Sequence, residues 1–542
     1  MTGSVGAEGR IARLAALLLT AQMLTALMLV ALLLVAGPAK AGAATPSKRQ
    51  LAAIEAQLRQ HVTTLASDEY GGREPGTNGE TLTLRYLARQ WFDIGLESAT
   101  NDPGNAWFAP VELVEREPQA SRAQFFHARR RVPAADAELF VVTSGLRSLI
   151  ENAPLVYVGR TLGGDALRTE LAGRVAVIFD SEAPPPEAGK PSSPTGPGSP
   201  AGAARPIDRA GRLLDGGAAA VLTVLDGERS LEDVIARRRR AGYALAGERI
   251  GGDIEAFVTA ATAKLLFAAA SGPDLAALRL AGAAPGFSSK PLGLTASFEA
   301  TNRETRIKTH NLIGKLEGRK GQGRGRDAGA VVLMAHWDHF GKCAEPPAED
   351  LICNGAVDNA SGLAVITEVA RLLSAGRPLD RDVYLVATTG EELGLLGALA
   401  FAENPPLPLG NVVAAFNVDS TGLVPAGLPV SVIGRGMTDL DAGIIKVLKG
   451  MKRKLAPGDA ANAYVKRQDS WVLMQHDVPS VMVSTSYSDP ERLEAFMDNI
   501  YHRPSDDSAK VVYGGMVDDV IIQAELVRHF ADAKAWPTAR AK

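Results

Sequence analysis

Residues 330–373 read AVVLMAHWDHFGKCAEPPAEDLICNGAVDNASGLAVITEVARLL, and this stretch decides the fold class. Val331–Ala335 is a short apolar run typical of a buried strand, and it leads directly into His336-Trp337-Asp338-His339. Gly362–Leu373 has the apolar spacing of a helix, and Asp358 stands just before it. A buried strand followed by a helix predicts one repeating unit of a parallel sheet.

The same alternation continues towards the C-terminus. Further short strands are expected at Val383–Thr389, Val412–Val418 and Val481–Ser484, and Met437–Lys452 supplies another helix. The pattern predicts an α/β fold with a mainly parallel central sheet and helices on both faces. In such sheets ligands bind beyond the carboxyl ends of the strands, so polar residues at those ends are the candidates for function.

Length and composition place limits on the class of protein. The chain has 542 residues, of which 46% are apolar and 22% charged. At roughly 100–200 residues per domain this predicts two or three folded units, and it excludes a disordered, collagen-like or polytopic membrane protein. The net charge of −3 provides no broad basic surface, so no nucleic-acid partner is expected. Two cysteines exclude a disulfide scaffold and a four-cysteine zinc finger.

The N-terminus has the pattern of an export signal. Arg10 and Arg13 precede an apolar run over residues 14–37, and Ala39-Lys40-Ala41 is the small-x-small pattern of a cleavage site. We expect residues 1–41 to be a signal peptide and the mature chain to begin near Gly42. The alternative is an uncleaved anchor over residues 14–37, the only membrane contact expected. Either way the protein is expected to be extracytoplasmic, in the periplasm or secreted.

The rest of the chain divides by texture. Residues 42–115 are expected to begin the main domain and residues 296–535 to complete it, with a tail at 536–542. Between them, residues 116–295 contain short β-type runs at Leu155–Val158, Val175–Phe179 and Ala219–Leu225. Residues 183–206 are rich in Pro, Gly and Ser, which predicts a surface loop. We therefore expect a smaller, β-rich insert domain over residues 116–295.

Five potential metal ligands stand at or just past the expected strand ends. They are His336, Asp358, Glu392, Asp419 and His502. Burying several carboxylates close together is costly unless a cation neutralises them. Mixed histidine and carboxylate ligands suit zinc, with cobalt or manganese as substitutes.

Five residues can hold two ions if one carboxylate bridges them. Asp358 is the expected bridge, with His336 and Asp419 completing one ion and Glu392 and His502 the other. Two such ions can activate a water and polarise the group it attacks. Asp338 is two residues from His336 and is expected to accept the second N–H of that imidazole ring.

The adjacent glutamates at 391 and 392 add a candidate base. Successive residues leaving a strand point in opposite directions, so Glu392 is expected to bind metal while Glu391 faces the water as general base. Taken alone, the pair also fits a solvated acidic turn.

These segments together resemble a known family. His336-x-Asp338-His339, Asp358-Asn-Ala-Ser-Gly362, Glu391-Glu392, Asn417-Val-Asp419 and Tyr501-His502-x-Pro504-x-Asp506-Asp507 resemble the motifs of the co-catalytic zinc aminopeptidases of the M28 peptidase family. The resemblance implies a zinc-dependent exopeptidase fold, two Zn2+ ions, peptide substrates, the ligand set given above, and Glu391 as base with Asp338 in support.

Other parts of the chain extend the resemblance. Leu65–Thr77 is similar to the family's opening segment. Pro154–Gly159, Gly173–Phe179 and Gly216–Leu225 are similar to the protease-associated (PA) domain that many members carry, which implies a PA-like insert.

One segment departs from the family pattern. Where many relatives have Ser-Asp-His or Ser-Asp-Gln, this chain reads Gln468-Asp469-Ser470-Trp471. That region lines the substrate side in the family, so Arg467, Asp469, Ser470 and Tyr501 are candidates for substrate contact, and the residue preference stays open.

Cys343 and Cys353 flank the loop between His339 and Asp358. In an oxidising compartment they are able to form a disulfide that closes a loop of about ten residues and contributes about 2–3 kcal/mol. The alternative is two free thiols.

The function expected is that of an exported dizinc aminopeptidase. One alternative is a dizinc carboxypeptidase on the same fold, which needs a cation such as Arg467 or Arg503 to hold a terminal carboxylate. Another is a binding or receptor protein that has lost catalysis, although the base and all five ligands are present here. Oligomeric state and the role of the insert stay open.

Overall fold

The computed structural model describes residues 46–102, 104, 106–134, 138–160, 170–182, 209–227, 229–240, 242–246, 253–270, 275–284, 287–319 and 329–537. The expected signal segment at 1–41 and the Pro-rich stretch at 183–206 lie outside these residues. The chain divides after Leu51 into two units, and the elements below belong to the second, apart from the first residues of α2.

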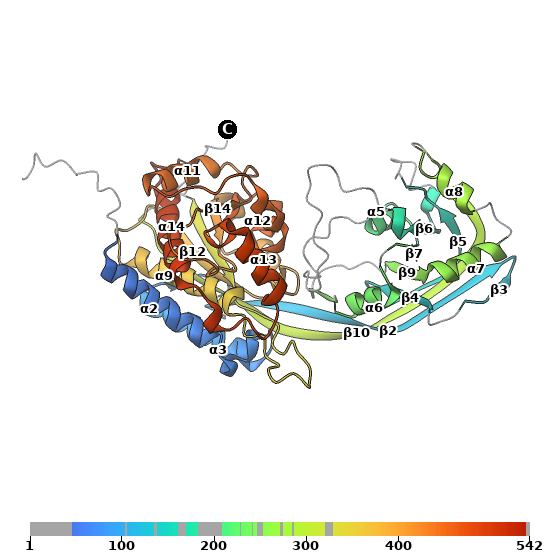
Figure 1. Ribbon diagram of the computed structural model, residues 1–542, viewed down its shortest axis with the longest axis horizontal. Coiled ribbons are helices and arrows are strands. Elements are labelled where there is room, and N and C mark those ends of the chain that lie inside the picture. Colours follow the sequence, from blue (N-terminus) through green and yellow to red (C-terminus); the bar gives the residue numbers. More distant parts are fainter. Residues whose placement is uncertain are drawn as a thin grey trace, which may run out of the picture. The chain divides into compact units, whose positions relative to one another are not determined.

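Helices and strands alternate through most of the described chain (Figure 1). The helices are α2 (Lys48–Leu65), α3 (Asn78–Ile94), α5 (Arg209–Asp215), α6 (Leu231–Arg240), α7 (Ala260–Ala269), α8 (Leu275–Ala281), α9 (Ser361–Ser374), α10 (Leu396–Glu403), α11 (Asp441–Gly450), α12 (Ser470–Gln475), α13 (Pro490–Asn499) and α14 (Tyr513–Ala531). The strands are β1 (Glu97–Ser98), β2 (Phe108–His127), β3 (Arg130–Val132), β4 (Leu139–Thr143), β5 (Arg147–Tyr157), β6 (Val175–Phe179), β7 (Ala220–Leu225), β8 (Tyr243–Leu245), β9 (Ile254–Thr259), β10 (Lys290–Leu316), β11 (Ala330–His336), β12 (Asp382–Thr388), β13 (Val412–Asn417), β14 (Ser431–Ile433) and β15 (Ser480–Ser484).

The strands that lead to the candidate ligands are parallel. Strand β11 pairs in parallel with β12 on one side and with β13 on the other, and β13 pairs in parallel with β15. Strands β14 and β10 flank this group as antiparallel neighbours. All seven residues of β11 and all seven of β12 are buried, as expected for strands covered on both faces. The mainly parallel sheet expected from the sequence is therefore confirmed.

Helices cover both faces of this part of the sheet. Val332 and Met334 of β11 share an apolar cluster with Phe401 of α10 and Leu473 of α12. Val331 and Leu333 alternate with them and point to the opposite face, where α9 and α14 pack against β11 and β12. The strands therefore lie between two helical layers, and their carboxyl ends meet at one edge.

Strands β2 and β10 continue from this sheet into the expected insert. They pair antiparallel from Phe108 opposite Leu312 to Phe126 opposite Thr295. Each strand runs without a break across an expected domain boundary, near residue 115 in β2 and near residue 295 in β10. The hydrogen-bonded ladder continues through β5, β6, β7 and β9, which are parallel, to β4.

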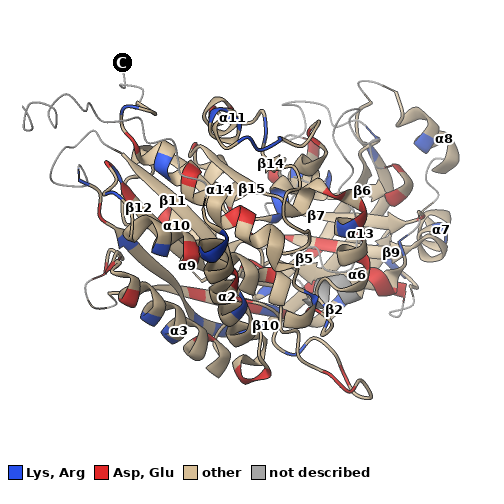
Figure 2. Cartoon of the chain, turned by 60° about the vertical axis from the view of Figure 1, so that its left-hand side comes forward, with Lys and Arg blue, Asp and Glu red and all other residues tan. Residues whose placement is uncertain are grey.

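Two features bear on partners. Lys and Arg residues are interspersed with Asp and Glu along the described elements (Figure 2). Of the helices in the described chain, none combines the length and the apolar character required to span a bilayer.

Candidate metal centre

The candidate ligands come together at the carboxyl edge of the parallel strands. His336 is the last residue of β11, Glu391 and Glu392 follow β12, and Asp419 follows β13. Asp358 lies in a π-helical turn, Ala356–Ala360, just before α9. His502 lies in the loop after α13. The parallel register of β11, β12 and β13 brings these loops to the same edge.

Asp358 stands between two histidines. Its Oδ1 lies 3.1 Å from His336 Nε2, and its Oδ2 lies 3.3 Å from His502 Nε2. His336 Nε2 is also 3.4 Å from Asp419 Oδ1, and His502 Nε2 is 3.1 Å from Glu392 Oε2. The five residues thus form two groups that share the Asp358 carboxylate, as the sequence predicts.

The site is buried and strongly charged. Burial would raise the pKa of the Asp358 carboxyl, but the nearby imidazole rings of His336 and His502 outweigh that effect and hold the pKa well below its ordinary range. Burial raises the pKa of Glu391 well above its ordinary value; nearby Glu392 and Asp419 add to the shift, and His336 opposes it. Shifted pKa values of this kind are common at functional sites.

The side chains fit a bound cation. Nε2 of His502 is buried and has no hydrogen-bond partner among the described residues, although oxygens of Asp358 and Glu392 lie within 3.3 Å. A cation held among these three atoms would satisfy them all. His336, Asp358 and Asp419 offer ligand atoms that lie within 4.8 Å of one another. Imidazole and carboxylate donors in this proportion are what zinc binds in proteins.

His339 belongs to the same cluster, although it is not one of the five ligands expected from the sequence. Its Nδ1 lies 2.6 Å from Glu392 Oε1, the oxygen that faces away from His502. His339 is buried, and it forms a further possible ligand group with Asp358 and Glu392. Its position three residues after His336 could have indicated a further ligand. The expected ligand set, however, needed only one histidine from that segment.

Asp338 is the hydrogen-bond partner of the second N–H of the His336 ring, and it acts through its main chain. The Nδ1–H of His336 donates to the main-chain oxygen of Asp338 at 3.1 Å, whereas the Asp338 carboxylate is 3.8 Å away. That carboxylate instead accepts the backbone N–H groups of Glu391 and Glu392, at 3.1 and 3.3 Å. Asp338 therefore supports the glutamate turn as well as His336.

The two glutamates do not point to opposite sides. Side-chain oxygens of Glu391 and Glu392 both come within 4.8 Å of a His336 nitrogen. Strand β12 ends at Thr388, so the alternation of a strand no longer applies at residues 391 and 392. Both are buried, which excludes the reading of a solvated acidic turn.

The substrate-side candidates divide into two pairs. Asp469 is buried and accepts a hydrogen bond from Thr388, and burial raises its pKa to about 6. Ser470 donates to Gln468 at 2.7 Å, inside the same turn. The interior bonds of these two side chains leave them little access to a substrate.

Arg467 and Tyr501 line a small pocket beside Asp419. The pocket has a volume of about 20 Å³, roughly the room for one water, and Tyr464 and Tyr487 also line it. The ring of Tyr501 stacks on that of His502 with centroids 3.6 Å apart. Arg503, the other cation considered, is exposed. Arg467 and Tyr501 are thus the candidates that the structure brings next to the cluster.

The loop between His339 and Asp358 is closed by a disulfide. Cys343 and Cys353 are bonded, with their Cα atoms 5.7 Å apart. The backbone N–H of Cys353 donates to the carbonyl of Gly341 at 2.9 Å, which ties the same loop together.

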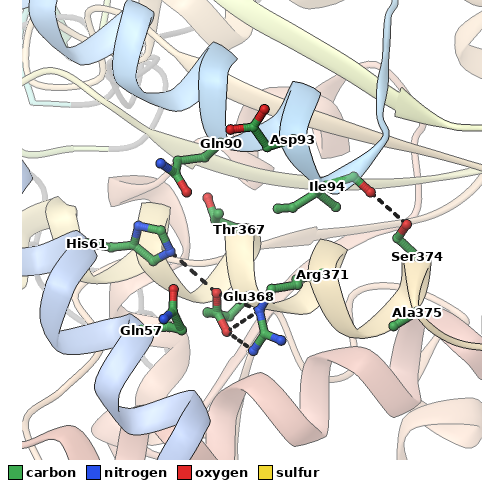
Figure 3. Close-up of a pocket in the computed structure, with 10 residues that line it drawn as sticks. All are labelled: Gln57, His61, Gln90, Asp93, Ile94, Thr367, Glu368, Arg371, Ser374 and Ala375. Carbon is green, nitrogen blue, oxygen red and sulfur yellow. Dashed lines mark hydrogen bonds and ion pairs between the residues drawn. The ribbon is translucent and has the colours of Figure 1, made fainter.

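A larger cavity of about 340 Å³ lies elsewhere, between α2, α3 and α9 (Figure 3). Several of its polar groups take part in hydrogen bonds between the helices. His61 lies 2.6 Å from the Tyr86 hydroxyl and 3.4 Å from Glu368, and Glu368 pairs with Arg371. These bonds join the three helices, and the cavity contains none of the candidate ligands.

Comparison with known proteins agrees with this geometry. Residues 311–524 match the model of peptidase family M28. A probable zinc metalloprotease of Pyrenophora tritici-repentis is 43% identical over 68 residues, 12% of this chain and 15% of that protein. One from Pyricularia oryzae is 30% identical over 116 residues, 21% of this chain and 22% of that protein. The chain thus matches less than a quarter of the length of either relative.

A solved structure extends the likeness of fold over most of the chain. The aminopeptidase from Aneurinibacillus sp. strain AM-1 superposes with a TM-score of 0.51 at 18% identity, covering 88% of this chain and 94% of that chain. The region matched by the family model includes all five candidate ligands and Glu391. Residues 311–524 of this chain therefore match peptidase family M28, and the candidate metal centre lies within the matched region.

Proposed function

We propose that the chain is an exported dizinc aminopeptidase that removes N-terminal residues from peptides. The observation that carries the proposal is the position of Asp358, whose two oxygens face His336 and His502 separately at 3.1 and 3.3 Å. A carboxylate placed in this way is suited to bridge two cations. The M28 domain and the zinc metalloprotease relatives support zinc as the metal.

Each side chain has a task that follows from its position. His336 and Asp419 would hold one zinc, Glu392 and His502 the other, and Asp358 both. When bound, the ions would polarise the scissile carbonyl and lower the pKa of the attacking water. Glu391 would take the proton of that water and return it to the leaving amine, as its place beside His336 allows.

Aminopeptidase activity is proposed over the carboxypeptidase alternative because the structural neighbour is an aminopeptidase. One observation favours the alternative. Arg467 stands in the pocket next to Asp419, where a guanidinium would suit a terminal carboxylate. Export is proposed from the signal-like N-terminus, and a PA-like role for residues 116–295 from resemblance alone.

The deciding experiment uses one peptide in three forms: free at both ends, N-acetylated, and C-amidated. The zinc-loaded protein is expected to cleave the free and amidated forms from the N-terminus and to leave the acetylated form intact. Cleavage of the acetylated but not the amidated form would identify a carboxypeptidase. Bound zinc without cleavage of any form would leave a binding protein.

The variant Glu391→Gln supplies the control for chemistry. It should keep its zinc, because Glu391 is not one of the proposed ligands. Its kcat should fall by about 10²–10⁴-fold through the loss of the base. A variant that kept its kcat would remove Glu391 from the mechanism without affecting the metal assignment.

A further inference from the structure

Arg73 is a fully buried arginine outside the family-matched region. It ends the 3-10 turn Asp68–Arg73 that follows α2, and its side chain has no exposed surface. Its backbone φ is 53°, in the left-handed region that residues with a Cβ rarely adopt. Buried arginines are rare unless their charge and donors are satisfied. The surroundings of Arg73 therefore need to account for both its charge and its five N–H groups.

All five N–H groups of Arg73 donate to main-chain carbonyls. The acceptors and distances are Trp337 (2.9 Å, from Nε), Leu65 (3.0 Å) and Asn354 (2.6 Å, both from Nη1), and Gly355 (2.8 Å) and Asp358 (3.4 Å, both from Nη2). Three of these carbonyls belong to the segment 354–358, which ends at the proposed bridging ligand. Trp337 follows His336. One guanidinium thus connects the backbone of both ligand-bearing segments.

Asp506 holds the same segment from its N–H side. Its Oδ1 accepts the backbone N–H of Val357 at 2.9 Å, and its Oδ2 accepts that of Asp358 at 3.0 Å. Its main-chain oxygen accepts the N–H of Ala356 at 3.1 Å. The turn that presents Asp358 is therefore bonded on its carbonyl side to Arg73 and on its amide side to Asp506.

The charge of Arg73 is offset by nearby carboxylates that do not form ion pairs with it. Among the described residues, no carboxylate lies within ion-pair distance of its guanidinium. Burial lowers the pKa of Arg73 to about 10, and the nearby Asp358 and Asp506 oppose that shift, so the side chain stays charged at neutral pH. The positive charge thus lies beside acidic ligands without occupying any ligand atom.

We infer that Arg73 is a positioning residue of the metal centre: its guanidinium holds the 354–358 segment and Trp337 so that the Asp358 carboxylate faces both histidines. The inference rests on the proposed metal function and deepens it. A lysine cannot replace Arg73, because it offers three N–H donors from one atom instead of five in a planar fork. The N-terminal segment would thus be part of the metal site although it contributes no ligand.

The test compares Arg73→Lys and Arg73→Met with the wild type. Zinc affinity is measured by competition with a chelator, and folding by circular dichroism. Both variants should bind zinc about 10–100-fold more weakly, the range found when groups behind metal ligands are removed. An Arg73→Lys protein that is folded and binds zinc with wild-type affinity would overturn the inference.

Arg381 provides a matched control. It is also a buried arginine, with 1% of its surface exposed. Its Nη1 donates to the main-chain oxygen of Phe530 at 2.5 Å. It stands just before β12, at the end opposite the metal centre. Arg381→Lys should lower the unfolding temperature but leave zinc affinity within about twofold of the wild type. Equal loss of zinc affinity in both arginine variants would point to general destabilisation and contradict a specific role for Arg73.

A measurement on the wild type covers the case in which the variants do not fold. Hydrogen exchange of the amides of Ala356, Val357 and Asp358 is followed in zinc-loaded and chelated protein. If Arg73 and Asp506 hold the turn, protection should fall by less than about tenfold when zinc is removed. Full loss of protection would show that the metal holds the turn, and it would overturn the inference. A wild type that binds no zinc would instead refute the proposed function.

Discussion

In the proposed function, Asp358 is the residue that would bridge the two metal ions. Its carboxylate faces His336 with one oxygen and His502 with the other. Asp358→Asn replaces one of these oxygens with an amide nitrogen that is a poor ligand. We expect the zinc content to fall below two ions per chain. The affinity for the remaining ion should fall by at least about 100-fold, because removing a ligand should weaken zinc binding at least as much as removing a group that supports a ligand. Plasma emission analysis of dialysed protein measures this.

Asp519 supplies the control for that substitution. It is a buried aspartate in the same domain that bonds to Ser484 and Thr485 instead of a histidine. Asp519→Asn should retain both zinc ions. If Asp358→Asn also retained two ions with undiminished affinity, Asp358 would not be the bridge.

Individual ligands could be predicted from sequence because each belongs to a short local motif, although only His336, Glu392 and Asp419 stand at the ends of strands. His336, Asp358, Glu392, Asp419 and His502 do meet at one site. Arg73 could not be predicted, because its role depends on carbonyls that only folding brings near. His339 lies in the same motif as His336, but the expected ligand set required only one histidine from that motif. The carbonyls that Arg73 binds lie up to 285 positions away in sequence. The sequence indicated Asp338 as the partner of the His336 ring but did not specify the accepting atom, since every aspartate offers both a main-chain carbonyl and a carboxylate.

At the scale of elements, strands were predictable where burial on both faces leaves an unbroken apolar run. Strands β11, β12, β13 and β15 lie within one residue of their expected bounds. Helix α11 is shorter than the stretch expected, beginning at Asp441 where Met437 was expected. The direction of Glu391 was not predictable, because it depends on where β12 ends.

The disulfide acts on a single loop. Cys343 and Cys353 close ten residues of chain between two ligand-bearing segments. Replacing both cysteines with serine should lower the free energy of unfolding by about 2–3 kcal/mol, because the unfolded chain gains conformational freedom. Thermal unfolding with and without reductant measures the effect in the wild type. A reductant-treated wild type that unfolded at the same temperature as the oxidised one would contradict the prediction.

Asp519 of helix α14 bonds to Ser484 and Thr485 at the end of β15, and its contribution to stability should depend on pH. Burial raises the pKa of Asp519 to about 7, against hydrogen bonds from Thr485 and Ser484 that lower it. The folded state therefore holds this proton more tightly than the unfolded state, whose pKa is near 3.8. The stability contributed by the protonated carboxyl is complete below about pH 4 and is lost as the pH rises to about 7.

Asp519→Asn removes this titration. Between pH 4 and pH 8 the wild type should lose on the order of 2–4 kcal/mol of unfolding free energy relative to the variant, because only the wild type has this titrating carboxyl. Urea unfolding of zinc-loaded protein at both pH values measures the shift. A difference independent of pH would show that Asp519 keeps an ordinary pKa.

At the scale of the whole molecule, the region of the expected insert shares strands with the regions before and after it. β2 and β10 run through both expected boundaries as one antiparallel pair. Amino-acid composition and turn-forming residues indicate where the pattern of the sequence changes. They do not indicate whether a strand continues across that change. The boundaries at 115 and 295 stay predictions, as does cleavage after residue 41.

The central claim is that this fold holds two zinc ions around Asp358. Crystals of the zinc-loaded protein, with diffraction recorded at the zinc absorption edge, test it directly. An anomalous difference map should contain two peaks about 3.5–4 Å apart. One should lie among His336, Asp358 and Asp419, and the other among His502, Asp358 and Glu392. A single peak, or peaks that do not contact Asp358, would contradict the account.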